Sequence, residues 1–165
     1  MTAIDRFAVE AALYQTWARH GADQSGAAAR EALKRITRLY LAALELPSPS
    51  SLELGDEVEA PEVSSDEWRA VFDAASRLPL DDYGVVFDPL IVPPEEPVVG
   101  SLADDIADIY RDVVSGLRLH SAGHQTDAAW AWGFLFRHHW GDHATSAIRA
   151  LHCWLEAHES DRSDE

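Results

Sequence analysis

Hydrophobic residues recur every three or four positions along most of the chain, which is the spacing of amphipathic helices. The first fifty residues predict two such helices, the first ending near His20 and the second capped by Ser25 and ended by Pro47. Their apolar stripes are Ile4, Phe7, Ala8, Ala11, Tyr14 and Trp17, and then Ala29, Ala32, Leu33, Ile36, Leu39, Tyr40 and Ala43.

Two further helices are predicted, each with a serine at its start. Ser64 and Glu67 have the spacing of a capping box, and Pro79 closes the helix that they open. Ser101 is suited to cap the next helix, and Gly123 suits the left-handed position beyond its end. The inward positions are Trp68, Val71, Phe72, Ala75 and Leu78, and then Leu102, Ile106, Ile109, Val113 and Leu117.

Two connections interrupt the helical pattern. Residues 47–63 are acidic, rich in proline and poor in aromatic side chains, so we expect a mobile loop. Residues 81–100 hold two short β-branched runs broken by prolines; a small hairpin is one alternative, but an irregular connection packed over the helices is favoured. Residues 159–165 are expected to form a disordered tail, which leaves a single domain over residues 1–158.

The C-terminal part of the chain predicts a central helix. Thr126 is suited to cap it, and the segment AAWAWGFLF is apolar nearly all round. Gly141 favours a break, after which Asp142 would cap a last helix. The predicted fold class is therefore all-α, a single bundle of five or six helices.

The charge of the chain restricts its partners. The formal net charge is −16 at pH 7, and such a polyanion repels phosphate backbones, so no nucleic acid is expected as a partner. No apolar run approaches the roughly 18 residues of a membrane span, and residues 1–20 lack a leader pattern. The single cysteine, Cys153, excludes an intramolecular disulfide. These features predict a cytoplasmic protein that does not contact membranes.

Rare residues recur in a fixed order over the second half of the chain. They are Leu102, Asp105, Asp108, Ile109, Tyr110, Arg111 and Asp112, followed by Trp130, Trp132, Phe136, His139, Trp140, Gly141, His143 and Arg149 to His152. In this order they resemble the bacterial domain-of-unknown-function family 5063. The resemblance implies an all-helical soluble fold and, because no reaction is assigned to the family, no catalytic residue.

A second resemblance concerns the region between the fourth and fifth predicted helices. Gly116, Leu119, Gly123, Ala128 and Trp132 have a spacing similar to that of one tetratricopeptide repeat. A single repeat cannot bury its own apolar face. We therefore expect one helical hairpin of this type inside a bundle rather than a repeat array.

Histidine and carboxylate side chains supply one candidate metal site. His139 and His143 are four residues apart, so on a continuous helix both imidazoles share a face and can chelate a divalent ion. Such a site needs further ligands. Asp108, Asp112 or His152 would serve if packing brings them close.

The expected break at Gly141 argues against this site. It would place His139 and His143 in different helices, so that they no longer lie one regular turn apart. The sequence therefore favours a protein without metal or cofactor, in which His139 and Trp140 hold the turn through hydrogen bonds.

The fourth predicted helix carries an acidic stripe. Asp104, Asp108 and Asp112 follow one another at intervals of four, so three like charges share one face. Helical Mg²⁺-dependent pyrophosphohydrolases have such stripes, but they supply carboxylates from a second helix as well. No second acidic set has the matching spacing here, and a solvated face is favoured.

Asp105 lies off this stripe, beside apolar neighbours, and we expect it to pair with Arg137 or Arg149. The residues near the C-terminal end are then expected to form a structural cluster. Its members are Asp105, Arg137, His139, Trp140 and His152.

Arg137 and His143 also have the loose form of the HEPN ribonuclease motif, in which the two side chains act on a scissile phosphate. The acidity of the chain and the glycine between them oppose this assignment.

The sequence thus favours an uncharacterised accessory or adaptor protein that acts through contacts with another protein. Tyr110, Trp132 and Trp140 are the candidate anchors for a partner helix. A metal-dependent hydrolase is the alternative function, and a HEPN-like ribonuclease is the third. The sequence does not determine the oligomeric state.

Overall fold

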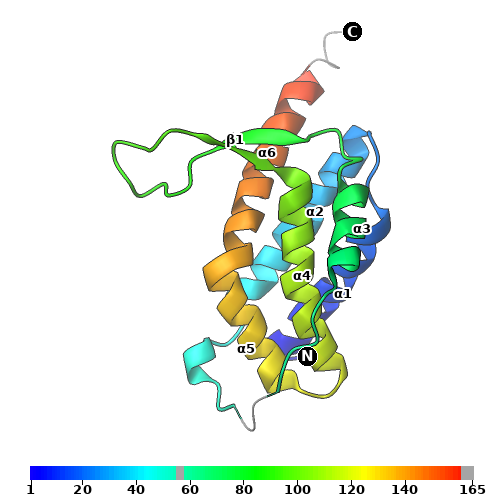
Figure 1. Cartoon of the computed structure of the whole chain (residues 1–165), viewed down its shortest axis with the longest axis vertical. Helices are drawn as coiled ribbons and strands as arrows, with labels where there is room; N and C mark the ends of the chain where they lie inside the picture. Colours follow the sequence, from blue (N-terminus) through cyan, green and yellow to red (C-terminus); the bar gives the residue numbers. More distant parts are fainter. Residues whose placement is uncertain (55–57, 161–165) are drawn as a thin grey trace.

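The computed structural model describes residues 1–54 and 58–160, and most of them are helical (Figure 1). Counting the continuous segment from α5 to α6 once, the described residues form five helices, which confirms the all-α prediction. The elements are α1 (Ala3–His20), α2 (Gly26–Leu44), a short 3-10 turn (Pro49–Ser51), α3 (Ser65–Ala75), β1 (Asp82–Val85), β2 (Val98–Ser101), α4 (Leu102–Ser121), α5 (Gln125–Leu135), a π-helical turn (Phe136–Trp140) and α6 (Gly141–Ser160).

Local capping chemistry fixes where several helices begin. The Ser25 hydroxyl accepts a hydrogen bond from the Ala28 amide, and Ser64 and Glu67 form the predicted capping box. Ser101 caps α4, and Gly123 beyond its end has the expected positive φ of 92°. The prediction of a Thr126 cap is wrong, because α5 begins one residue earlier and Thr126 lies in its first turn.

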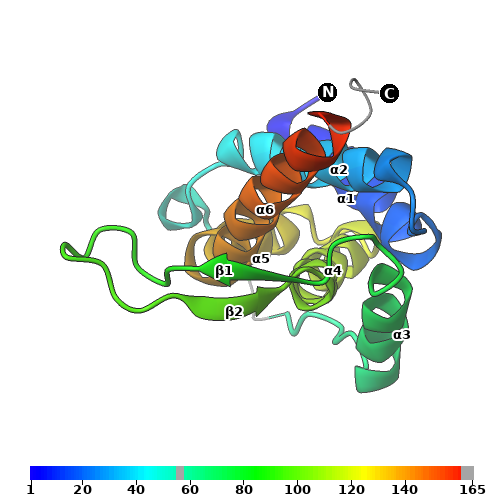
Figure 2. The same cartoon turned by 90° about the horizontal axis from the view of Figure 1, so that it is seen from above.

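Helix α4 lies at the centre of the bundle, with α1, α3, α5 and α6 around it (Figures 1 and 2). The indole N–H of Trp132 donates to the Val113 carbonyl oxygen over 2.9 Å, which ties α5 to α4. A Cβ atom on Gly116 would lie 2.3 Å from that indole nitrogen, so only glycine allows this approach. The Tyr14 hydroxyl ties α1 to α4 by donating to the Ile106 carbonyl oxygen over 2.9 Å.

The expected break at Gly141 does not occur. The chain stays helical from α5 to α6 through the π-helical turn, in which the Gly141 amide donates to the carbonyl of Phe136, five residues earlier. A Cβ atom at position 141 would lie 2.2 Å from that carbonyl oxygen. Glycine therefore permits the widened turn here and does not end the helix.

The prediction of an irregular connection over residues 81–100 is wrong for residues 82–85 and 98–100, which form strands, whereas residues 86–97 contain no helix or strand. Strands β1 and β2 pair antiparallel, with Tyr83 opposite Gly100. The reason is that Pro89, Pro93, Pro94 and Pro97 all lie between the two strands, where none of them removes a ladder hydrogen bond. We call residues 82–101 the hairpin arm; it projects away from the helices (Figures 1 and 2).

The ends of the loop predicted as mobile contact the bundle. The Ser115 hydroxyl donates to the Pro61 carbonyl over 3.1 Å, the Arg118 guanidinium donates to the Glu62 carbonyl, and Val63 is buried. Residues 55–57 of that loop and residues 161–165 of the predicted tail lie outside the described residues. Within the part that the structure describes, no helix is long and apolar enough to cross a membrane.

Candidate metal centre

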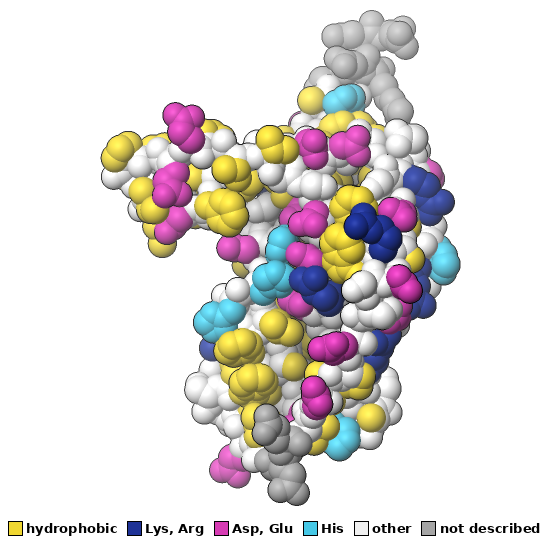
Figure 3. Space-filling model, in the orientation of Figure 1, with side chains coloured by type: hydrophobic (Ala, Val, Ile, Leu, Met, Phe, Trp, Pro, Cys, Tyr) yellow, Lys and Arg dark blue, Asp and Glu magenta, His cyan; other side chains and the backbone are white. Residues whose placement is uncertain are grey.

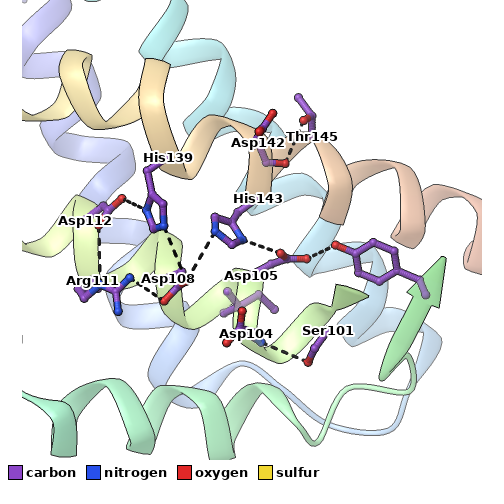
Figure 4. A network of polar contacts seen from close by, with 12 residues as sticks. Ser101, Asp104, Asp105, Asp108, Arg111, Asp112, His139, Asp142, His143 and Thr145 are labelled. Atoms are coloured by element: carbon purple, nitrogen blue, oxygen red, sulfur yellow. Dashed lines mark hydrogen bonds and ion pairs between the residues drawn. The ribbon is translucent and has the colours of Figure 1, made fainter. Parts of the chain in front are cut away.

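One face of α4 presents carboxylates to α6. Asp105 and Asp112 are 5% and 7% exposed, and Asp108 lies between them on the same side of the helix (Figure 4). Carboxylates are rarely buried to this extent without partners that satisfy their oxygens. The identity of those partners defines the site.

The π-helical turn brings two histidines to this face. His139 lies in the turn itself and His143 in the first turn of α6, with ring centroids 4.9 Å apart. Both imidazoles point toward α4 (Figure 4). Because the helix continues through Gly141, the separation expected from a break does not arise.

Each histidine is oriented by a carboxylate. His139 Nδ1 lies 2.6 Å from Asp112 Oδ2, and His143 Nδ1 lies 2.8 Å from Asp105 Oδ1. An ionised carboxylate only accepts hydrogen bonds, so each Nδ1 carries the hydrogen. The neutral form of each ring then has its lone pair on Nε2.

The two Nε2 atoms converge on Asp108. Asp108 Oδ2 lies 3.6 Å from His143 Nε2 and 4.0 Å from His139 Nε2. Ligand atoms of these three residues all lie within 4.8 Å of one another. When both imidazoles are neutral, three atoms with free lone pairs, the two Nε2 atoms and Asp108 Oδ2, thus lie close together.

The other oxygen of Asp108 is held by two donors. The Trp68 indole N–H, from α3, donates to Oδ1 over 2.8 Å, and Arg111 Nη2 lies 3.0 Å from the same atom. These contacts orient the carboxylate so that Oδ2 is presented to the histidines. Trp68 and Arg111 are therefore positioning residues of the centre.

The hairpin arm contributes one further contact. The Tyr83 hydroxyl donates to Asp105 Oδ2, opposite the oxygen that accepts from His143. The ring of Tyr83 lies over Gly100, where a Cβ atom would be 2.8 Å from its Cζ. Tyr83, Asp105 and His143 thus form a continuous hydrogen-bonded chain from the arm to the centre.

Burial and hydrogen bonding shift several pKa values here. Burial raises the pKa of the Asp105 and Asp112 carboxyls, while the hydrogen bonds from the histidines act in the opposite direction. The hydrogen bond to Asp105 raises the pKa of the His143 imidazole. Burial, and then the bond to Asp105, raises the pKa of Tyr83, so its hydroxyl stays protonated and donates.

The centre is accessible from solvent. The side chains of His139, His143 and Asp108 are 37%, 24% and 14% exposed. Figure 3 shows histidine and acidic side chains together in the hollow beneath the hairpin arm. Part of each of these three side chains is therefore open to solvent, while Asp105 and Asp112, the carboxylates behind the imidazole rings, are largely shielded.

Other residues named from the sequence lie elsewhere. The expected pairing of Asp105 with Arg137 or Arg149 is wrong, because His143 and Tyr83 occupy both of its oxygens. Arg137 Nη1 instead donates to the Ser48 hydroxyl over 3.2 Å. His152 is exposed on α6 and lies outside the cluster in which it was expected.

The three candidate anchor rings are in the core. Tyr110, Trp132 and Trp140 are each 0% exposed, so none of them is available to a partner helix in this structure. The Tyr110 hydroxyl accepts a hydrogen bond from Arg19 over 2.7 Å, and the Trp140 indole packs against Phe136. All three rings are part of the buried core.

Sequence reasoning missed Trp68 and Tyr83 as parts of the site. Trp68 was assigned only to an apolar stripe, and Tyr83 lies in the stretch expected to be irregular. Trp68 bonds to an α4 residue 40 positions later in the chain, and Tyr83 bonds to one 22 positions later. No local spacing signals such contacts, because they depend on how α3 and the hairpin arm dock.

Comparisons with known proteins identify a family and one solved structure of similar fold. A family model described as "Domain of unknown function (DUF5063)" matches residues 2–157. The crystal structure of protein BF1032 from Bacteroides fragilis, a structural genomics target, is similar with a TM-score of 0.73 and 22% sequence identity, covering 91% of this chain and 90% of that one. At this identity the likeness concerns the fold alone. No curated protein matches the chain.

Proposed function

The chain belongs to the DUF5063 family, whose description assigns no activity, and from the geometry of the centre we propose that it binds a divalent transition-metal ion through Asp108, His139 and His143. One observation carries this proposal. Both Nε2 atoms and Asp108 Oδ2 face one point, while each Nδ1 is hydrogen-bonded to a second carboxylate. Carboxylates placed in this way behind histidine ligands are a general feature of metal sites.

The distances are compatible with an ion. Two donors bound at about 2.0–2.1 Å to a tetrahedral ion lie about 3.3 Å apart. The separations of 3.6 and 4.0 Å from Asp108 Oδ2 are longer than this, and all three ligand atoms lie within 4.8 Å of one another, so the side chains must move closer together to bind an ion.

The donor set favours one class of metal. Imidazole nitrogens suit Zn²⁺ and its transition-metal neighbours, whereas Mg²⁺ and Ca²⁺ prefer oxygen ligands only. The acidic stripe does not form a Mg²⁺ site of the pyrophosphohydrolase type, because Asp108 and Asp112 are bonded to histidine, arginine and tryptophan.

Three protein ligands fit a catalytic centre better than a structural one. Structural zinc sites are closed by four protein ligands, whereas catalytic sites keep a position open for water or substrate. A metal held there by Asp108, His139 and His143 would supply Lewis-acid chemistry, which includes the activation of water. We therefore propose metal-dependent hydrolysis as the activity of this site, with Asp105 and Asp112 orienting the two histidines.

Metal binding is tested on the full chain purified without a histidine tag. Calorimetric titration with Zn²⁺ and elemental analysis are expected to give one ion per chain, and His139→Ala and His143→Ala are expected to abolish it. His152→Ala is the matched control, because this histidine is exposed on α6 outside the centre. Absence of stoichiometric metal, or equal loss in the control, would refute the proposal.

A contact role as an accessory or adaptor protein is the second candidate. The rings named from the sequence do not support it, since all three are buried. What favours it is the hairpin arm, where Phe87, Leu90 and Val92 are 76%, 87% and 86% exposed. Substituting these side chains and measuring partner binding tests this role separately from metal binding.

A further inference from the structure

The hairpin arm carries exposed apolar side chains at high density. Ile91 and Val98 are 43% and 41% exposed and Val99 is 77% exposed, in addition to Phe87, Leu90 and Val92. Single exposed hydrophobic residues are ordinary, whereas contiguous ones on a soluble protein mark contact surfaces. The arm projects from the bundle in both views, so the helices do not cover its tip (Figures 1 and 2).

The arm is held at its base and ordered at its tip. Tyr83 is bonded to Asp105, and the Leu102 amide donates to the Asp81 carbonyl over 2.9 Å. At the tip, Asp88 Oδ1 accepts from the Leu90 amide over 2.8 Å. Four prolines fix φ between the strands. A surface organised in this way loses little conformational entropy when it docks.

The charge of the arm is of one sign. Between Arg77 and Arg111 the chain has no lysine, arginine or histidine. Five carboxylates lie at or near the arm, interspersed with its apolar side chains: Asp81, Asp82, Asp88, Glu95 and Glu96. The surface is therefore apolar and strongly acidic at once.

The combination of apolar and acidic side chains on the arm favours some binding partners over others. A second copy would bring the same carboxylates and a further net charge of −16, and like charges across an interface cost affinity. Nucleic acids and anionic membranes are repelled for the same reason. A basic protein surface is attracted, and an apolar cleft on it would cover the exposed side chains.

We infer that the hairpin arm docks a protein whose contact surface is basic and contains an apolar cleft. This inference rests on the contact role given above as the second candidate, and it is independent of metal binding. It names the chemistry of the partner: lysine or arginine opposite Glu95 and Glu96, and an apolar pocket for Leu90 and Val92.

The test uses the full chain and a probe peptide of alternating lysine and leucine, titrated by calorimetry. Leu90→Ser with Val92→Ser is expected to weaken binding roughly tenfold or more. Leu41→Ser with Leu44→Ser is the matched control, since these α2 side chains are 60% and 58% exposed but lie outside the arm. The control is expected to bind as the unaltered chain does.

Charge variants give a second readout that does not alter the apolar surface. Glu95→Gln with Glu96→Gln is expected to weaken binding and to reduce its salt dependence. Glu53→Gln with Glu59→Gln removes two exposed charges elsewhere and is expected to have less effect. Circular dichroism of each variant establishes that the fold is retained.

Four outcomes would overturn the inference. A peptide of alternating lysine and serine that binds equally well would show attraction to any polycation, and equal binding by all variants would exclude the arm. Self-association in sedimentation, lost on altering Leu90 and Val92, would identify a second copy as the occupant. Binding to phosphatidylserine vesicles through the arm would identify a membrane instead.

A further probe separates the chemistry of the partner from the contact role itself. If a peptide of alternating glutamate and leucine binds the arm as tightly, the contact role stands and the basic partner is wrong. If no peptide binds in an arm-dependent way, both are wrong. The Zn²⁺ affinity of the same variants is expected to equal that of the unaltered chain. A loss of peptide binding then cannot be attributed to the proposed metal centre.

Discussion

Two regions, the candidate metal centre and the hairpin arm, depart from the ordinary distribution of side chains in opposite ways. The centre lies between α4 and α6. At the centre, the carboxylates of Asp105 and Asp112 are buried, and each is hydrogen-bonded to a histidine. On the arm, apolar side chains such as Leu90 lie in solvent at 87% exposure. Burying charge and exposing apolar surface both cost free energy, so each region points to a requirement other than folding.

The two regions also differ in what holds them. The centre is fixed by the packing of α3 and α6 against α4, whereas the arm is attached at its base and projects from the bundle (Figure 1). A preorganised centre suits an ion, which needs donors at set distances. An exposed arm suits a larger partner that supplies its own surface.

The largest effect is expected from Gly141→Ala. The added Cβ would lie 2.2 Å from the Phe136 carbonyl oxygen, so the π-helical turn must change and His139 must rotate away from His143. We expect a loss of about 2 kcal/mol in unfolding free energy or more, together with loss of Zn²⁺ binding. Thermal and urea denaturation measure the first effect, and calorimetry the second.

Gly26→Ala is the control for that variant, because nothing lies within 4 Å of a Cβ atom at that position. It is expected to leave the stability nearly unchanged. Normal Zn²⁺ binding by Gly141→Ala would contradict the dependence of the centre on the widened turn.

A smaller effect is expected from Asp105→Asn. The variant keeps the size of the side chain but removes the charge that orients His143, so Zn²⁺ affinity should fall about 10- to 100-fold, as for other carboxylates behind metal ligands. Calorimetric titration measures the change. Asp104→Asn, one residue away on α4, should bind nearly as the unaltered chain does, and an equal loss there would point to general electrostatics instead.

The smallest effect is expected from Tyr83→Phe, which cuts the direct link between the two regions. Removing the hydroxyl leaves Asp105 Oδ2 without that donor, and we expect a cost of about 1 kcal/mol. Hydrogen exchange should become faster in β1 and β2, and Zn²⁺ affinity should fall a few fold. Unchanged exchange in both strands would show that the arm is held without this bond.

The sequence predicted most of the helices because their determinants are local. Ser25, Ser64 and Ser101 cap helices as expected, since each side chain accepts a hydrogen bond from the amide three residues later. It was wrong on the hairpin and on Gly141. In both places a residue that usually interrupts structure is accommodated: the prolines lie between strands, and the glycine allows a wider turn.

For the site, the spacing of His139 and His143 and the candidates Asp108 and Asp112 came from the sequence alone. Their arrangement did not. Asp105 bonds to His143 and not to Arg137 or Arg149, and this contact spans 38 residues. The hydrogen bond from Trp68 to Asp108 spans 40. Such contacts depend on the docking of whole elements.

By itself, then, the sequence determined an acidic, helical chain with capped ends and a set of histidines and aspartates at spacings that metal ligands also have. Only the tertiary structure decided that two Nε2 atoms and one carboxylate oxygen face the same point, and that the hairpin arm extends into solvent. The physical reason is that capping and helix periodicity act within one turn, whereas convergence of donors depends on how α4, α3 and the continuous helix from α5 to α6 pack.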